Sequence, residues 1–125
     1  MGLASAELEA FVPVGDVARA RNFYEGVLGC EVLSTDDYGA MLRSQGTALR
    51  LARVEGDSRP PYTVLGWIVP DIQEAVQSLA ATDVAFRRYE GMGQDELGIW
   101  IAPSGDRVAW FADSEGNTLS VTQMA

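Results

Sequence analysis

The side chains that could take part in chemistry are mainly carboxylates, arginines and hydroxyls, because the sequence contains no histidine and no lysine. Zinc and non-heme iron sites are usually built around imidazole or thiolate ligands, so a typical transition-metal site is not expected. A Schiff-base lysine and a Ser–His or Cys–His nucleophile cannot form. Any acid–base catalysis would therefore have to use Asp, Glu, Tyr, Cys or water.

A row of short hydroxyl side chains lies near the end of the chain, in the stretch GNTLSVTQ. Its alternation puts Leu119 and Val121 on one face of a strand, and Thr118, Ser120 and Thr122 on the other. A half-buried strand normally shows charged or large polar groups to water. The row therefore lies on the surface or lines a cavity, and the alternation alone leaves both interpretations open.

Length and composition favour one globular domain. The chain has 125 residues, of which 47% are hydrophobic. No apolar run approaches the length of a membrane span, and the N-terminal MGLASAELEA lacks the basic and apolar regions of a signal peptide. We therefore expect a cytoplasmic protein with no membrane partner. The net charge of −9 disfavours a nucleic-acid partner.

The single cysteine, Cys30, excludes an internal disulfide. It follows Gly29 and has no basic neighbour in the sequence, so a buried and unreactive thiol is expected. The acidic stretches STDDYG and GMGQDELG lack the spacing of an EF-hand and are expected to be solvated turns or loops.

Hydrophobic periodicity divides the chain into two halves with similar element order. The first half predicts a helix from 17 to 28, capped by Asp16 and closed by Gly29. The second half predicts a helix from 71 to 81, capped by Asp71, after a linker at 55–62 that contains two prolines. The predicted strands are 8–14, 30–36, 39–44, 47–54, 64–69, 84–89, 99–102, 108–112 and the final GNTLSVTQ segment.

Internal duplication of a βαβββ unit explains this order. The stretch FVPVGDVARARNFY aligns with GWIVPDIQEAVQSL, which places Asp16 over Asp71. Similarly, GTALRLAR aligns with GNTLSVTQ and places Arg50 over Ser120. The second copy is expected to carry one extra strand near 99–102.

Three stretches in this order resemble the vicinal oxygen chelate superfamily of glyoxalases, extradiol dioxygenases and bleomycin-resistance proteins. VGDVARARNFYEGVLGCEV resembles the opening of these proteins, VPDIQEAVQSL the second helix, and VAWFADSEGNTLSV the closing segment, where Ser114 replaces a proline. The resemblance implies an α+β fold with two tandem βαβββ modules, whose curved mixed sheets enclose a cavity with the helices outside. We expect one domain over 1–125, with module one at about 7–54, the linker at 55–62 and module two at about 63–124.

Metal-dependent members of that superfamily place four ligands in the cavity, typically His, Glu, His and Glu. Carrying these positions over gives Glu9, Arg50, Val64 and Ser120. One carboxylate, one cation, one apolar side chain and one hydroxyl do not hold a divalent metal. The resemblance therefore implies a member without the metal centre, and neither a metal nor another cofactor is expected.

Glu9 and Arg50 are expected to lie close enough to form an ion pair in a partly desolvated cavity. In one interpretation the pair is only a structural relic of the metal site. In the other, the guanidinium of Arg50 binds a carboxylate, phenolate or enolate of a ligand.

Aromatic side chains are candidates for the cavity wall. Phe11 shares the face of Glu9, and one residue of each neighbouring pair Trp100–Ile101 and Trp110–Phe111 must face the cavity. The predicted ligand-binding residues are Glu9, Phe11, Arg50, Trp100, Trp110 and Ser120.

The resemblance favours a metal-independent protein that binds an amphipathic, aromatic or anionic small molecule without transforming it, as bleomycin-resistance proteins do. A homodimer is expected. The alternative is a metal-free lyase, isomerase or dioxygenase-like enzyme of the same superfamily, with Glu9 as the base and Arg50 stabilising an anionic intermediate. The typical metal-dependent glyoxalase or extradiol dioxygenase would need histidines, which this chain does not have.

Overall fold

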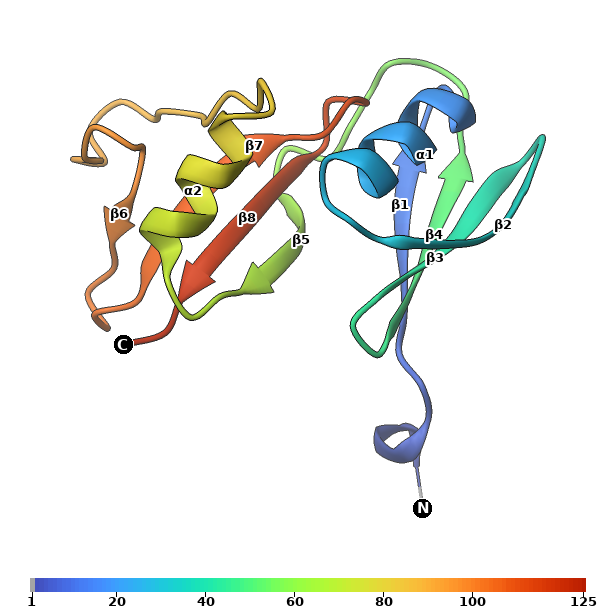
Figure 1. Ribbon diagram of the computed structural model, residues 1–125, viewed down its shortest axis with the longest axis horizontal. Helices are drawn as coiled ribbons and strands as arrows, with labels where there is room; N and C mark the ends of the chain where they lie inside the picture. The colour runs from blue at the N-terminus through green and yellow to red at the C-terminus, as the bar shows by residue number, and fades with distance from the viewer. Residues whose placement is uncertain (1) are drawn as a thin grey trace. The chain divides into compact units, whose positions relative to one another are not determined.

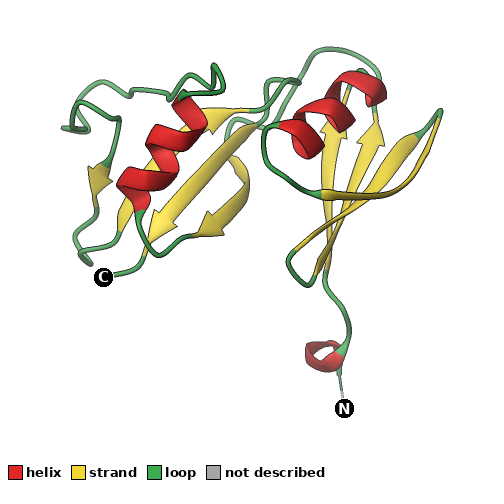
Figure 2. Ribbon diagram, in the orientation of Figure 1, coloured by secondary structure: helices red, strands yellow, loops and turns green. Residues whose placement is uncertain are grey.

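Two helices with aspartate N-caps and two four-stranded sheets make up the computed structural model, which describes residues 2–125 (Figures 1 and 2). Met1, with which the predicted domain begins, lies outside the described residues. The chain forms two compact units, unit 1 over Met1–Arg59 and unit 2 over Pro60–Ala125. Within the described residues, neither unit contains a helix long and apolar enough to span a membrane.

Unit 1 contains one helix and one mixed sheet. The strand order is β1-β4-β3-β2, in which β1 runs parallel to β4 and the other neighbours are antiparallel. A short 3-10 helix, Leu3–Ser5, precedes the sheet. The elements are β1 (Glu9–Val14), α1 (Val17–Gly26), β2 (Glu31–Asp36), β3 (Gly39–Ser44) and β4 (Thr47–Arg53).

Helix α1 begins and ends close to the positions that the sequence predicts. The side chain of Asp16 accepts a hydrogen bond from the backbone N–H of Arg19 at 3.0 Å, which satisfies one free donor of the first turn. The helix ends at Gly26, two residues before the predicted end, and Gly29 reverses the chain with a φ of +75°. Tyr24 and Ala20 are its fully buried residues.

One face of each sheet packs against the helix of its own unit. In unit 1 this face carries the alternating apolar residues of β1, β3 and β4, namely Val12, Val14, Leu42, Leu49 and Leu51. The opposite face, which we call the open face of unit 1, carries Glu9 and Phe11 on β1 and Arg50 on β4. The buried pattern follows the period of two that the sequence predicts.

Unit 2 repeats this arrangement with strand order β5-β8-β7-β6. Asp71 caps α2 by accepting from the backbone N–H of Glu74 at 3.2 Å, and Gln123 ties the same helix end to β8 by accepting from Ile72 N–H at 3.0 Å. The elements are β5 (Thr63–Ile68), α2 (Ile72–Ala80), β6 (Trp100–Ile101), β7 (Arg107–Ala112) and β8 (Thr118–Gln123). The core of unit 2 is formed by Ile72 and Val76 of α2 together with Phe111 of β7 and Leu119 and Val121 of β8.

Strand register supports the internal duplication at the level of single residue pairs. Phe11 lies opposite Arg50 in unit 1, and Gly66 lies opposite Ser120 in unit 2. These are the positions that the two sequence alignments equate. Ser120 therefore occupies in unit 2 the position that Arg50 occupies in unit 1.

The predicted strand at 84–89 is wrong. The strand predicted at 99–102 forms as β6, but it is not an extra strand, because the sheet of unit 2 has four strands like that of unit 1. Only an isolated bridge joins Phe86 to Phe111, and β6 supplies the fourth position of the sheet. The edge position that β2 occupies in unit 1 is therefore filled in unit 2 by two separate pieces, Phe86 and β6, which both pair with β7. The segment 88–99 lies between these two pieces, and we call it the inserted segment. Three of its residues, Gly91, Gly93 and Gly98, have φ values of +83°, +67° and +87°, which a continuous strand does not accommodate.

Candidate functional site

The open face of unit 1 brings together three predicted site residues. Arg50 on β4 lies between Phe11 on β1 and Met41 on β3 in the strand register. The Nε of Arg50 donates to Oε2 of Glu9 at 3.1 Å, so the expected ion pair is formed. However, the Arg50 and Glu9 side chains are 46% and 37% exposed, so the pair is less desolvated than expected. A second ion pair on the same unit joins Arg43 to Glu7.

A hollow of about 210 Å³ lies beside Arg50 within unit 1. It is lined by Ser34, Asp36, Tyr38, Gly39, Ala40, Met41, Arg50, Leu51 and Ala52. Gly39 is required where β3 approaches β4, because a Cβ at this position would lie 2.1 Å from the carbonyl oxygen of Leu51. Arg50 thus borders a concave surface while its Nε remains bound to Glu9.

The hydroxyl row of β8 does not lie on the surface as a solvated strand face. Thr118 and Ser120 are only 5% and 7% exposed, and Thr122 is half-buried. Ser120 lies between Gly66 and Trp110 in the sheet. A Cβ added at Gly66 would lie 2.8 Å from the Ser120 Oγ, so this hydroxyl occupies the space that the missing side chain leaves.

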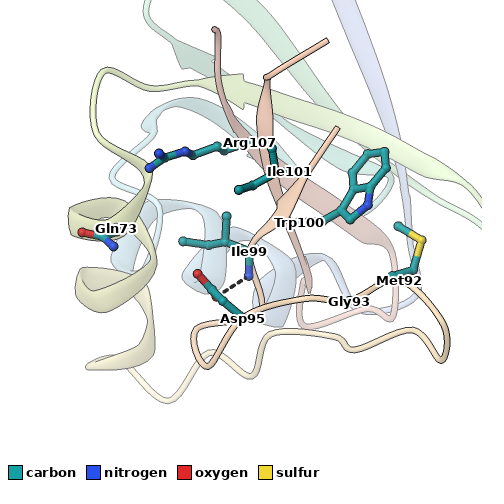
Figure 3. Close-up of a pocket in the computed structure, with 8 residues that line it drawn as sticks. All are labelled: Gln73, Met92, Gly93, Asp95, Ile99, Trp100, Ile101 and Arg107. Atoms are coloured by element: carbon teal, nitrogen blue, oxygen red, sulfur yellow. Dashed lines mark hydrogen bonds between the residues drawn. The ribbon is translucent and has the colours of Figure 1, made fainter. Parts of the chain in front are cut away.

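The sequence left open which residue of each pair Trp100–Ile101 and Trp110–Phe111 faces the cavity. In both pairs the tryptophan lies on the same face of the sheet as Ser120, and we call this face the open face of unit 2. Phe111 is fully buried on the helix side. Ile101, which is 64% exposed, points away from Trp100 in Figure 3. The rings of Trp100 and Trp110 lie 5.9 Å apart between centroids. These two indoles form a continuous aromatic surface.

Sequence reasoning missed Arg87 and Tyr89, which lie at the same face. The Tyr89 ring meets Trp110 edge-on at 5.5 Å, and the backbone N–H of Arg87 donates to the Trp110 carbonyl at 2.7 Å. The Arg87 guanidinium donates to the Thr118 hydroxyl and lies 3.5 Å from the Gly116 carbonyl oxygen. Alternation in AFRRY puts Arg87 and Tyr89 on the face opposite Phe86, and this signal could have identified both.

A second hollow in unit 2, of about 350 Å³, lies between α2, the inserted segment and β6 (Figure 3). Its lining residues are Gln73, Met92, Gly93, Asp95, Ile99, Trp100, Ile101 and Arg107. The wall is held by Asp95, whose carboxylate accepts from the backbone N–H groups of Leu97 and Ile99 at 2.9 Å each.

The four positions that correspond to metal ligands in the related superfamily do not fit a metal ion in this chain. The Glu9 carboxylate is bound to Arg50, and Val64 lies at a register shift of β5 and has no donor side chain. Ser120 contributes a single hydroxyl. Over residues 2–125, no group of three or more Cys, Asp or Glu side chains is arranged so that it could hold a metal ion.

Cys30 is buried, as the sequence predicts. Burial raises the pKa of its thiol, and a hydrogen bond with Ser44 opposes this rise only in part. A thiol with a raised pKa is a poor nucleophile at neutral pH.

The fold is similar to several solved structures at low sequence identity. Lactoylglutathione lyase from Agrobacterium tumefaciens has a TM-score of 0.75 at 17% identity, with 98% of this chain and 96% of that chain covered. A glyoxalase/bleomycin resistance protein/dioxygenase superfamily member from Sphaerobacter thermophilus has a TM-score of 0.74 at 23% identity, with 98% and 99% covered. TioX from Micromonospora sp. ML1 has a TM-score of 0.71 at 16% identity, with 97% and 100% covered.

Sequence comparison gives the family. None of the curated proteins matches the chain in sequence. The family model described as Glyoxalase/Bleomycin resistance protein/Dioxygenase superfamily matches residues 6–121, which is most of the chain and reaches from before β1 into β8. The chain therefore belongs to the glyoxalase/bleomycin resistance protein/dioxygenase superfamily, as its three sequence motifs predict.

Proposed function

We propose that this chain is a metal-independent protein that binds a flat, amphipathic small molecule. The observation that carries this function is the aromatic surface of unit 2, where Tyr89, Trp100 and Trp110 adjoin one another. Indole and phenol rings bind planar ligands by stacking and by burial of apolar area. Thr118 and Ser120 lie on the same face, and their hydroxyls would supply polar contacts to the ligand.

Taken by itself, the open face of unit 1 carries three other predicted ligand-binding residues, Glu9, Phe11 and Arg50. Phe11 is 60% exposed beside Arg50, so its ring is available to a ligand. Arg50 retains N–H donors beyond the one that binds Glu9, since a guanidinium carries five. The pair can therefore serve as a polar contact without either charge being left unpaired.

The same pair favours binding over catalysis. The Arg50 Nε–H occupies Oε2 of Glu9, which leaves only Oε1 of this carboxylate to take a proton from a substrate. Carboxylate and guanidinium also neutralise each other, which weakens the field that would stabilise an enolate. A binding role requires neither group to react.

We also propose that the protein forms a homodimer and is located in the cytoplasm. Both units expose large apolar side chains, among them Leu8, Phe11 and Ile68. A dimer would cover part of this exposed apolar surface. Sedimentation equilibrium tests the dimer, and a mass equal to one chain at micromolar concentration would contradict it.

Binding of 2-naphthamide, a neutral bicyclic aromatic probe, tests the function directly. We expect the probe to quench tryptophan fluorescence saturably, and Trp110→Ala to weaken its binding by about tenfold or more, as loss of a stacked ring does. Ile101→Ala is the matched control, because this residue lies on the opposite side of β6 from Trp100. The function is refuted if the parent protein binds no probe at millimolar concentration, or if folded Trp110→Ala binds as tightly as the parent.

A further inference from the structure

Arginines on the open faces of the two units differ in how their charge is balanced. Arg50 in unit 1 is paired with the carboxylate of Glu9. Arg87 in unit 2 donates instead to a neutral hydroxyl and approaches a neutral carbonyl oxygen, those of Thr118 and Gly116. Within the part of the chain that the structure describes, no carboxylate forms an ion pair with Arg87.

The position of Arg87 is fixed by both its backbone and its side chain. Its N–H bonds the Trp110 carbonyl at 2.7 Å, and its carbonyl oxygen accepts from Gln94 Nε2 at 2.9 Å. Its guanidinium reaches Thr118, which neighbours Ser120 on the open face of unit 2. Because the half-buried side chain of Arg87 is already held in place, it loses little conformational entropy when a ligand binds to it.

The aromatic surface lies next to this cation in the sheet, since the cation binds Thr118, and Ser120, two residues further along β8, pairs with Trp110. The Tyr89 ring contacts Trp110 edge-on at 5.5 Å, and the backbone N–H of Arg87 bonds to the carbonyl oxygen of the same tryptophan at 2.7 Å, so both residues lie beside Trp110. A ligand ring stacked on this surface would bring a substituent at its edge toward the guanidinium. The residues thus combine an apolar platform with a single positive group at its border.

From this juxtaposition, and resting on the function proposed above, we infer that Arg87 is the anion-binding residue and that the ligand is a planar aromatic carboxylate. The guanidinium has donors left after its contacts with Thr118 and Gly116, and two parallel N–H groups match the two oxygens of a carboxylate. The overall charge of −9 repels anions at long range, so a local unpaired cation is needed to select one. Arg50 is paired with Glu9 and so offers no such uncompensated charge.

Paired probes that differ only in charge test the inference. Dissociation constants of 2-naphthoate and 2-naphthamide are measured by tryptophan quenching for the parent, Arg87→Gln, Arg87→Lys, Arg88→Gln and Arg50→Gln. Arg88→Gln is the matched control, since it removes the same charge from the adjacent residue, whose side chain donates to the Glu96 carbonyl at 2.5 Å. Circular dichroism and urea unfolding show that each variant is folded.

The parent is expected to prefer naphthoate over naphthamide by about tenfold or more, the size of a charge-assisted hydrogen bond. Arg87→Gln should abolish the preference and leave naphthamide binding within about twofold, Arg87→Lys should retain part of it, and Arg88→Gln should retain all of it. If the parent shows no preference, or folded Arg87→Gln keeps it, the inference is wrong while binding itself stands. Loss of the preference in Arg50→Gln but not in Arg87→Gln would assign the anion to Arg50 instead. If neither probe binds the parent, the proposed function fails as well.

Discussion

The Arg50 Nε and the Glu9 Oε2 lie 3.1 Å apart across the parallel pair of strands β1 and β4. Each side chain keeps more than a third of its surface exposed, at 46% for Arg50 and 37% for Glu9. An ion pair with this exposure gains only modest Coulomb energy, because water screens both charges. We therefore expect the pair to contribute little to holding the sheet together, and both side chains stay accessible, as the binding role that we propose requires.

A double-mutant cycle on this pair should give a coupling energy of about 1 kcal/mol or less. Glu9→Gln, Arg50→Gln and the double variant are compared with the parent by urea unfolding at low and at high salt. We expect the small coupling to shrink further at high salt, as it does for exposed charges. The exposed helical pair Arg21–Glu25, at 3.9 Å, provides a reference cycle of similar size.

A coupling energy of about 3 kcal/mol or more would contradict this expectation and would mark a buried structural pair. In that case the structural-relic interpretation of Glu9 and Arg50 would gain support. The cycle thus separates the two interpretations without the need for a ligand.

Gly66→Ala should destabilise the protein through one contact, that with Ser120. The new Cβ would lie 2.8 Å from the Ser120 Oγ, so this hydroxyl must move and the free energy of unfolding should fall by about 1–2 kcal/mol. Ser120→Ala removes the obstructing atom, and we expect the double variant to recover most of that loss in urea unfolding. Additive losses in the double variant would contradict the close contact.

Gly39→Ala is the control for that experiment. Here the added Cβ would lie 2.1 Å from a backbone atom, the Leu51 carbonyl oxygen. No side-chain truncation can relieve a backbone clash, so the loss should exceed that of Gly66→Ala and resist rescue.

Sequence alternation predicted most of the fold because most strands of each sheet bury one face on the side of their unit's helix. Both helix caps, the turns around Gly29 and Gly39, and the equivalence of Arg50 with Ser120 follow from local residue types and from the duplication. The choice of Phe111 over Trp110 for the core could not be predicted, because adjacent large apolar residues satisfy either face equally well.

The inserted segment could not be predicted from the sequence, for a different physical reason. The residues around Phe86 have the composition of a strand, yet only one bridge forms because the glycines that follow turn the chain away from the sheet edge. The pairing of Trp100 with Val108, three residues along β7 from the Phe111 that bridges to Phe86, joins segments that no local sequence pattern brings together. The proximity of Arg87 to Thr118 depends on this split edge and was missed with it.

Stability should depend on pH through Cys30. Burial raises the pKa of this thiol, so the folded protein holds the thiol proton more tightly than the unfolded chain does. The resulting stabilisation is fully present below the unfolded pKa of about 8.5 and is lost as the pH rises through the folded-state pKa. Unfolding in urea from neutral pH to about pH 10 should show a decline in the parent that is smaller in Cys30→Ala. An identical decline in both proteins would contradict the assignment, since every other group titrates alike in the two.

Gln94 should hold the inserted segment in place and, through it, Tyr89. Its amide accepts from the Tyr89 N–H at 2.7 Å and donates to the carbonyl oxygens of Arg87 at 2.9 Å and Gly98 at 2.8 Å. Gln94→Ala removes all three bonds and takes this donor from the part-buried carbonyl oxygens of Arg87 and Gly98, so the free energy of unfolding should fall by about 1–3 kcal/mol. Hydrogen exchange at the Tyr89 amide should accelerate by about tenfold or more, whereas the exposed helical variant Gln77→Ala leaves it unchanged. If Gln94→Ala retains parent-like protection at Tyr89, the segment is held by other contacts, and Tyr89 is positioned by its ring contact with Trp110 alone.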